Sequence, residues 1–265
     1  MGIAPGWQFF RLRKMKDQFP DTDYPVVRTV GLSGVLVTFS ETLNEDANRA
    51  ALAFRAAVDA AGWDWIEESA TSLVSAFFRT DLSQHSAAQI RADLQDMLTI
   101  RDWAAAPLPE GRTLWHIPAV FGGPHAPQFE DAAAAAGLDP DTALQEITQT
   151  RLRVLTIGFA PGQPYLGTLG SHWDVPRLTE LSPNVPQGAL VAAVRQICLF
   201  SNDTPTGWRH VGQTAFRTFR PWSDTPFPLS PGDELLFHAI SDAEYESITR
   251  ANEDGSGGAT SDVLT

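Results

Sequence analysis

The sequence predicts an α+β fold, in which a small N-terminal α+β domain precedes a domain built mainly of antiparallel strands. Two observations lead to this prediction. Residues 23–106 combine short β-branched runs with two amphipathic helical patterns. Residues 112–249 hold many strand patterns and few helical ones, separated by Pro- and Gly-rich turns, which is typical of an antiparallel barrel or sandwich.

The N-terminal block begins with two short β-branched runs. They surround Gly31 and Gly34, so a hairpin or a pair of strands is expected over residues 25–39. A helix follows, because residues 42–44 offer capping side chains and Gly62 ends the pattern. The buried face of this helix is a stripe with helical spacing: Ala47, Ala51, Phe54, Val58 and Ala61.

Two further strands and a helix complete this block. Strands are expected around residues 63–67 and 72–78, and a second amphipathic helix begins near Ser83. The order β-β-α-β-β-α predicts a compact α+β domain over residues 23–106. The stretch 104–111, rich in proline and small residues, is the natural linker to the next block.

The second block, residues 112–249, is expected to be rich in strands. Strands are predicted over residues 112–121, 151–156, 189–200, 208–219 and 234–240. Helices are predicted over residues 129–136, 139–149 and 242–249, the second of them capped by Asp139 with Pro140 in its first turn. Residues 170–187 are expected to be irregular. At the two ends of the chain, residues 1–22 are predicted to be an arm, and residues 250–265 a disordered tail rich in Gly, Ser and Asp.

Composition limits the functional classes. The chain has 265 residues, 43% of them hydrophobic, and a net charge of −13, which disfavours a general polyanion binder such as a nucleic-acid protein. No apolar run approaches the roughly 20 residues needed to span a bilayer, and the basic N-terminal stretch lacks the apolar core of a secretory signal. We therefore expect a cytoplasmic protein with neither nucleic acid nor membrane as a partner.

Lysine and cysteine usage exclude several chemistries. Lys14 and Lys16 are the only lysines, so a biotin attachment site, a Schiff-base lysine or a Walker-type phosphate lysine would have to use the N-terminal arm. Bound phosphate would depend on arginine, backbone amides or a partner subunit. The single cysteine, Cys198, lies in an apolar run and is expected to be buried and unreactive.

No metal motif or catalytic triad is apparent. The six histidines show no helical His-x-x-x-His pair, so no metal site is expected. The run Ser171, His172, Trp173, Asp174 holds a hydroxyl, an imidazole and a carboxylate, but adjacency in sequence is not triad geometry. His210, near a predicted strand start, is a candidate for the rim of a cleft.

The stretch 157–167 combines a predicted strand end with a cluster of glycines and prolines. Glycine permits positive φ and proline fixes φ, so this segment is expected to be a rigid, shaped loop. One interpretation is a structural corner that buries Phe159 and Tyr165. The other is a binding loop whose backbone amides can hold an anion.

This loop resembles a family signature. Its residues read GFAPGQPYLG and are similar to GFxPGFPYLGG of the KipI family, which contains the B subunit of bacterial 5-oxoprolinase, allophanate hydrolase subunit 1 proteins and a segment of urea carboxylases. Further short matches follow the same order: residues 117–123 resemble IPVxYGG, and shorter matches lie at 185–188, 205–208, 212–214 and 231–233. The resemblance extends over roughly residues 25–245.

Several polar residues of the family pattern are replaced. The charged run after YGG reads Pro124, His125, Ala126, Pro127, Gln128 in this chain, and Ile147 stands where the family has a histidine. The GGQTGIYP run keeps Gln196 and otherwise reads Val194, Arg195, Ile197, Cys198, Leu199, Phe200, Ser201, and GRT becomes Gly212, Gln213, Thr214. Since ionised groups often supply transition-state stabilisation, these changes threaten catalysis more than folding.

The resemblance implies a cyclophilin-like β-barrel for the second domain and a subunit of an ATP-dependent 5-oxoprolinase-type hydrolase that opens a cyclic amide. ATP, with Mg²⁺, is the implied cofactor, and the implied partner is a companion C subunit, similar to allophanate hydrolase subunit 2. No catalytic residue is assigned. The expected substrate-binding face is Phe159, Gly162, Gln163, Tyr165, Gln196, Trp208 and His210. The alternatives are a non-catalytic regulator that inhibits a sensor histidine kinase and a degenerate scaffold subunit.

Overall fold

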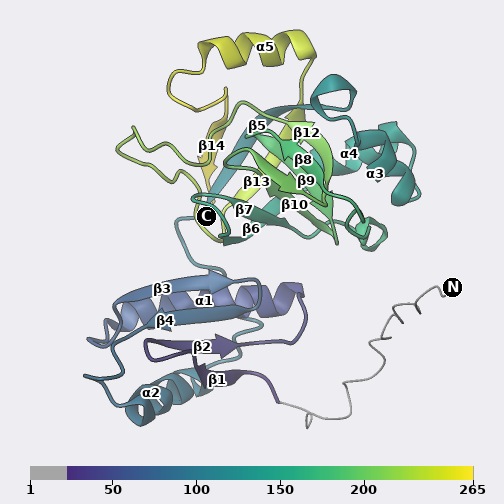
Figure 1. The fold of residues 1–265 in the computed structure, drawn as a ribbon. Coiled ribbons are helices and arrows are strands. Elements are labelled where there is room, and N and C mark those ends of the chain that lie inside the picture. The colour runs from purple at the N-terminus through teal and green to yellow at the C-terminus, as the bar shows by residue number, and fades with distance from the viewer. Residues whose placement is uncertain (1–22, 265) are drawn as a thin grey trace, which may run out of the picture.

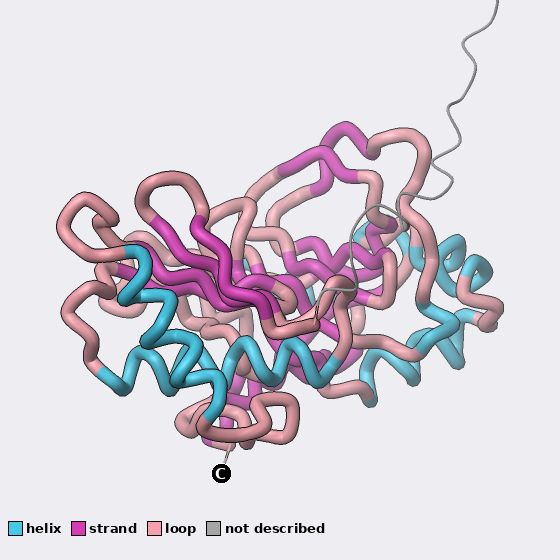
Figure 2. The backbone as a smooth tube through the Cα atoms, turned by 90° about the horizontal axis from the view of Figure 1, so that it is seen from below, coloured by secondary structure: helices cyan, strands magenta, loops and turns pink. Residues whose placement is uncertain are grey.

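The computed structural model describes residues 23–264, which form two units joined by a short linker (Figure 1). The N-terminal unit has a four-stranded sheet in the order β1-β2-β4-β3. Its elements are β1 Val26–Thr29, β2 Gly34–Thr38, α1 Glu45–Ala61, β3 Glu68–Ser72, β4 Ser75–Arg79 and α2 Ala87–Thr99. Both helices share one apolar core with the sheet and cover the same face of it (Figure 2). The expected order of elements is confirmed.

The ends of α1 are those that the sequence predicts. The Asn44 side chain accepts a hydrogen bond from the backbone N–H of Ala47 at 2.8 Å, and Gly62 ends the helix with φ of +62°. The strand expected around residues 63–67 is not formed there: Trp63 and Trp65 stack with ring centroids 5.3 Å apart, and strand β3 follows at Glu68–Ser72. Helix α2 starts later than expected, because Ser86 is its N-cap.

The second unit contains most of the strands and three helices. Its strands are β5 Thr113–Phe121, β6 Leu152–Ile157, β7 Pro164–Gly167, β8 Ser182–Val185, β9 Ala189–Ala193, β10 Gln196–Leu199, β11 Thr204–Thr206, β12 Arg209–Gln213, β13 Glu234–Ala239 and β14 Thr260–Val263. Its helices are α3 Phe129–Ala135, α4 Pro140–Gln149 and α5 Asp242–Ala251, with short 3₁₀ turns η1 Gly123–His125 and η2 Ser171–Trp173.

Seven of these strands close into a barrel. Their order is β12-β9-β10-β7-β6-β13-β5, and the pairing of β12 with β5 completes the circle. The interior is filled by fully buried side chains such as Ile117, Leu152, Ile197 and Phe237. The predicted α+β class with a β-barrel in the second half is therefore confirmed.

Three details of the predicted barrel differ from the structure. The β5–β13 pair is parallel, whereas a wholly antiparallel barrel was expected. Residues 189–200 form two strands, β9 and β10, because Val194 and Arg195 turn the chain with φ of 45° and 64°. Residues 189–200 contain neither glycine nor asparagine, so the sequence gives no local signal for this turn. The strand predicted over residues 208–219 ends at Gln213, after which Phe216 packs into the core.

The prediction of a disordered tail over residues 250–265 differs from the structure as well. Strand β14 pairs with β5 in antiparallel register. Ahead of it, the Asn252 amide donates to the carbonyl of Ala215 at 2.6 Å and accepts from the N–H of Gly257 at 2.7 Å. At Gly257 a Cβ would lie 2.3 Å from the backbone N of Phe216, so glycine permits this close approach. A Gly- and Ser-rich composition here serves backbone packing.

The N-terminal arm expected over residues 1–22 lies outside the described residues. Among residues 23–264, no helix combines the length and the apolar character that crossing a membrane requires.

Candidate functional site

The loop between β6 and β7 is a tight, internally bonded turn. The N–H of Gly158 donates to the carbonyl of Gln163 at 3.0 Å, and the N–H of Gln163 donates to that of Ala160 at 3.1 Å. Gly162 has φ of +71°, and a Cβ at this position would lie 2.4 Å from the carbonyl oxygen of Thr218. The glycine is therefore required by both conformation and space.

Phe159 is the exception to the interpretation of this loop as a buried corner. Its φ is +71°, which is uncommon for a bulky residue, and its side chain is 80% exposed. Tyr165, by contrast, is half-buried at the end of the loop. The loop thus presents one aromatic ring to solvent and turns the other inward.

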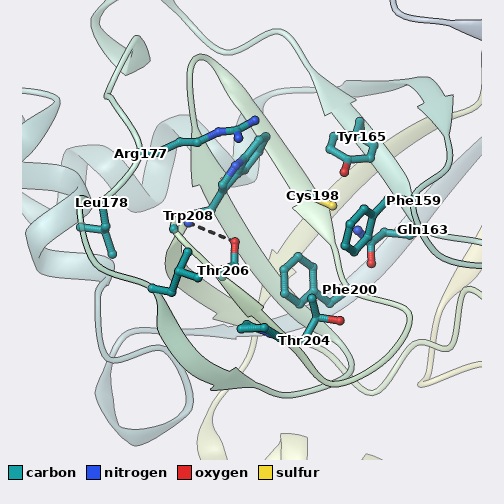
Figure 3. Close-up of a pocket in the computed structure, with 13 residues that line it drawn as sticks. Phe159, Gln163, Tyr165, Arg177, Leu178, Cys198, Phe200, Thr204, Thr206 and Trp208 are labelled. Atoms are coloured by element: carbon teal, nitrogen blue, oxygen red, sulfur yellow. Dashed lines mark hydrogen bonds between the residues drawn. The ribbon is translucent and has the colours of Figure 1, made fainter.

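A cavity of about 440 Å³ opens beside this loop (Figure 3). It lies on the outer face of the barrel, because Cys198 and Phe200 of the β10 segment point into it while Ile197 and Leu199 point into the barrel core. Strand β11 of the small β8–β11 sheet, with the segment that leads into β8, forms the opposite wall. The barrel interior is filled by buried side chains, so this cavity lies outside the barrel core.

Strand register explains which side chains share this outer face. Tyr165 is paired with Cys198 across β7 and β10, and Cys198 with Val191 across β10 and β9. Val191 is paired in turn with His210 of β12. Directly opposed residues project from the same face of a sheet, so these four form one row across four strands.

Gln163 forms the most unusual part of the cavity wall. Its side chain is 1% exposed, and its Oε1 has no hydrogen-bond partner among residues 23–264. Buried amide oxygens are nearly always paired, because leaving one unpaired costs the free energy of its lost hydration. The amide is within hydrogen-bonding range of Tyr165 and Cys198.

Burial controls the ionisation of these neighbours. Loss of hydration raises the pKa of the Tyr165 hydroxyl, and it raises the pKa of the Cys198 thiol far above the usual range, while the hydrogen bond from Gln163 opposes both shifts. Both groups are therefore neutral near pH 7. The Tyr165 hydroxyl is available as a hydrogen-bond donor, and Cys198 is not a thiolate nucleophile.

A single cation stands at the mouth of the cavity. The Arg177 guanidinium lies over the Trp208 ring, 5.5 Å from its centroid (Figure 3). Within residues 23–264 it makes no ion pair. The Trp208 ring also meets Tyr165 edge-on at 6.0 Å. An aromatic wall with an exposed guanidinium above it suits a planar ligand that carries a negative charge.

The structure brings together four of the seven predicted site residues. Phe159, Gln163, Tyr165 and Trp208 line the cavity. Gly162 shapes the loop and packs against Thr218.

Gln196 and His210 share the outer face but do not line the cavity. Gln196 is paired with Gly167 at the start of β10. The His210 ring is buried and its Nε2 lies 3.2 Å from Oε1 of Gln213, while its backbone N–H donates to Oε1 of Gln128 at 2.7 Å. Burial lowers the pKa of His210. Its position fits a structural role under the rim.

Several residues of the cavity were not predicted. Arg177, Leu178 and Leu181 come from the irregular stretch before β8, and Thr204 and Thr206 come from β11. Their sequence context carries no motif. Alternation was the one available signal, since Gln196, Cys198 and Phe200 must share a face if residues 196–200 are extended.

The chain belongs to the family described as carboxyltransferase domain, subdomain C and D, which it matches over residues 25–229. A curated relative, the 5-oxoprolinase B subunit of Bacillus subtilis, is 27% identical over 228 residues, covering 83% of this chain and 95% of that protein. Another, the 5-oxoprolinase B subunit of Escherichia coli, is 35% identical over 129 residues, covering 49% of this chain and 59% of that protein.

Solved structures share the fold. TTHA0988 superposes with a TM-score of 0.65 at 25% identity, over 82% of this chain and 40% of that one. The Kluyveromyces lactis urea amidolyase gives a TM-score of 0.68 at 16% identity, over 90% of this chain and 16% of that one. In both structures the matched region is thus a minor part of a longer polypeptide.

Proposed function

We propose that this chain is a subunit of an ATP-dependent amidolytic system and acts with a companion cyclophilin-like subunit to open a cyclic amide such as 5-oxoproline. The observation that carries the proposal is the match to the 5-oxoprolinase B subunit of Bacillus subtilis, which extends over 95% of that protein. The cavity beside the signature loop supports it, because its size and lining suit a small planar ligand.

The exposed rim of the cavity supports a companion subunit. Phe159 is 80% exposed and Leu181 is 67% exposed, and both line the mouth. Large apolar side chains that surround a pocket are typical of a surface on which another protein docks. In the proposal, the companion subunit covers this rim and excludes water from the bound amide.

The residues of this cavity do not suit MgATP. They include one guanidinium, that of Arg177, and no carboxylate, whereas Mg²⁺ in nucleotide sites is held by carboxylates together with phosphate oxygens. Among residues 23–264, no three His, Cys, Asp or Glu side chains are grouped so as to hold a metal ion. We therefore propose that the nucleotide binds where the companion subunit contributes residues.

ATP hydrolysis would supply the driving force, since an unstrained lactam is a poor electrophile. The contribution of this chain is to bind and orient the amide. Trp208 provides a flat face, the neutral Tyr165 hydroxyl can donate to a carbonyl oxygen, and Arg177 can pair with an anion. Positioning of this kind is a large part of the rate enhancement in enzymes.

The test is ATP turnover by the complex of this chain with the companion encoded beside it. We expect turnover that depends on 5-oxoproline and requires both subunits. Trp208→Ala should lower kcat/KM by about tenfold or more, because it removes an aromatic wall of the cavity. Trp222→Ala is the matched control, since Trp222 is 62% exposed and lies outside the cavity.

A well-formed complex without 5-oxoproline-dependent turnover would overturn the proposal. Two further measurements then separate the alternatives. Suppression of histidine kinase autophosphorylation by the purified chain would indicate a regulator. Loss of the companion on deletion of this chain, with its intrinsic activity unchanged, would indicate a scaffold.

A further inference from the structure

The residue at position 163 differs from the family signature. The signature reads GFxPGFPYLGG, and Gln163 occupies the place of its second phenylalanine. The glycines and prolines around it are retained. A carboxamide therefore stands at this position of the cavity wall.

The Gln163 side chain points to a ligand because its acceptor oxygen has no partner within residues 23–264, although its amide is within hydrogen-bonding range of Tyr165 and Cys198. Its Oε1 is buried without a partner among the described residues, and its side chain lines the cavity. The neighbouring walls are apolar and aromatic, with Phe159 and Phe200 beside it (Figure 3). An unpaired buried acceptor is stabilised when a bound molecule brings an N–H donor.

Cyclic amides have the geometry that a carboxamide can recognise twice. A primary carboxamide carries its acceptor oxygen and its donor nitrogen on one edge. Open-chain secondary amides are trans, so their N–H and C=O point in opposite directions. In a small lactam the ring forces the cis form, which places N–H and C=O on the same edge. A lactam can therefore form two parallel hydrogen bonds with Gln163.

The second recognition element is the cation at the mouth. Arg177 is exposed, stacked on Trp208, and free of any ion pair among residues 23–264. Guanidinium groups pair readily with carboxylates. The cavity thus offers an amide contact at its inner wall and a carboxylate contact at its opening, with an aromatic face nearby.

We propose that Gln163 is a specificity-determining residue that selects cyclic amides over open-chain amides, and that Arg177 selects those that carry a carboxylate. This inference rests on the proposed function, since it names how the same cavity distinguishes its substrate. The lactam N–H donates to Oε1 of Gln163, and the lactam oxygen accepts from the Gln163 amide nitrogen or the Tyr165 hydroxyl.

The test compares four ligands by titration calorimetry on the complex with the companion subunit. These are 5-oxoproline, N-methyl-5-oxoproline, N-acetylalanine and 2-pyrrolidinone. The second lacks the N–H donor, the third is an open-chain amide with a carboxylate, and the fourth is a lactam without a carboxylate. We expect 5-oxoproline to bind at least about tenfold more tightly than each of the others, because each lacks a hydrogen bond or an ion pair.

Two variants test whether Gln163 and Arg177 are responsible for these ligand preferences. Gln163→Leu should abolish the preference for 5-oxoproline over N-methyl-5-oxoproline and leave the preference over 2-pyrrolidinone. Arg177→Gln should do the reverse. Gln84→Leu, on the exposed surface of the N-terminal unit, is the control and should change neither. The melting temperature of Gln163→Leu should stay close to that of the wild type, because the substitution removes the unpaired Oε1 along with the contacts of the amide to Tyr165 and Cys198.

The inference is overturned if no ligand binds to the wild-type complex, if all four bind alike, or if Gln163→Leu keeps the wild-type preferences. Its failure can be told apart from failure of the proposed function. ATP turnover with an unchanged KM for 5-oxoproline in Gln163→Leu refutes the inference alone. Selective lactam binding without ATP turnover refutes the proposed function alone.

Discussion

Asn48 donates a hydrogen bond from its side-chain Nδ2 to the carbonyl oxygen of Leu155, 3.1 Å away, and so joins helix α1 to barrel strand β6. The same Nδ2 lies 2.9 Å from the carbonyl oxygen of Leu73. Asn48 is fully buried. A further bond, from Thr156 Oγ1 to the carbonyl of Thr71 at 2.8 Å, crosses the same boundary. These hydrogen bonds join the two units through backbone carbonyls that depend on side-chain donors, and an ion pair between Arg153 and Glu45 crosses the same boundary.

Asn48→Leu should destabilise the protein. The substitution leaves two buried carbonyl oxygens without a donor, and we expect a loss of about 1–3 kcal/mol in the free energy of unfolding. Chemical denaturation with a probe in each unit would measure it. Arg49→Ala is the control, because its ion pair with Glu45 is solvent-accessible and should change stability by less than about 0.5 kcal/mol. Equal stability of both variants would contradict this role for Asn48.

Docking of the C-terminal segment should depend on Gly257. Gly257→Ala places a methyl group 2.3 Å from the backbone of Phe216, whereas Gly258→Ala meets only side-chain atoms of Ile248 and Pro118, at 3.5 and 3.6 Å. Both residues have positive φ, so the strain of that conformation is shared. We expect Gly257→Ala to lose at least about 1 kcal/mol more stability. Amide hydrogen exchange over residues 257–263 should rise in that variant; unchanged exchange would contradict the close packing.

Stability should depend on pH through His210. Burial lowers the pKa of its folded-state imidazole, so the unfolded chain binds this proton at higher pH than the folded chain does. Stability is therefore fully present above the unfolded value of about 6.5 and falls as the pH drops below it. In His210→Gln, the melting temperature should fall less than in the wild type as the pH is lowered from 8 to below about 6.5. His85→Gln is the control, and an unchanged pH dependence in His210→Gln would exclude this residue as the cause.

Cys198 should resist thiol reagents in the folded protein. It is 2% exposed, and burial raises its pKa, so very little thiolate forms near pH 7. Because it is the only cysteine, the colour released by a disulfide reagent reports on this one site. We expect slow reaction in buffer and one equivalent within minutes in denaturant. Rapid labelling of the native protein would show that the cavity floor opens.

Phe159 should contribute to function at the expense of stability. Its positive φ costs about 1–2 kcal/mol for a residue with a Cβ, while its ring is largely exposed. Phe159→Gly relieves the strain, so its melting temperature should exceed that of Phe159→Ala, which keeps the strain without the ring. Both variants should lose turnover in the complex. If both retain full turnover, the exposed ring has no part in binding or docking.

Local signals in the sequence predicted many elements of this fold, and non-local contacts account for what it missed. Asn44 and Gly62 bound α1 as expected, because capping acts within a few residues. The turn at Val194 and Arg195 has no such signal, since strand pairing imposes its conformation. The role of Gly257 depends on Phe216, which is distant in sequence.

The candidate site divides in the same way. The loop motif identified Phe159, Gln163 and Tyr165, and the cavity contains all three. Arg177 and Leu181 belong to a stretch without periodicity, and only the folded arrangement brings them to the loop. The motif locates Gln163 in the sequence, but only the structure shows that its Oε1 is buried without a partner among the described residues.

The location of the cavity outside the packed barrel has a consequence for how such a protein can change over time. Substitutions in its walls alter which molecule is accommodated while the stabilising interior stays untouched. Related proteins can therefore differ in the ligand that they bind, or bind a partner without catalysing a reaction, while each of them keeps a stable fold. The barrel provides the stability of the fold, and substitutions on its outer surface can change binding specificity.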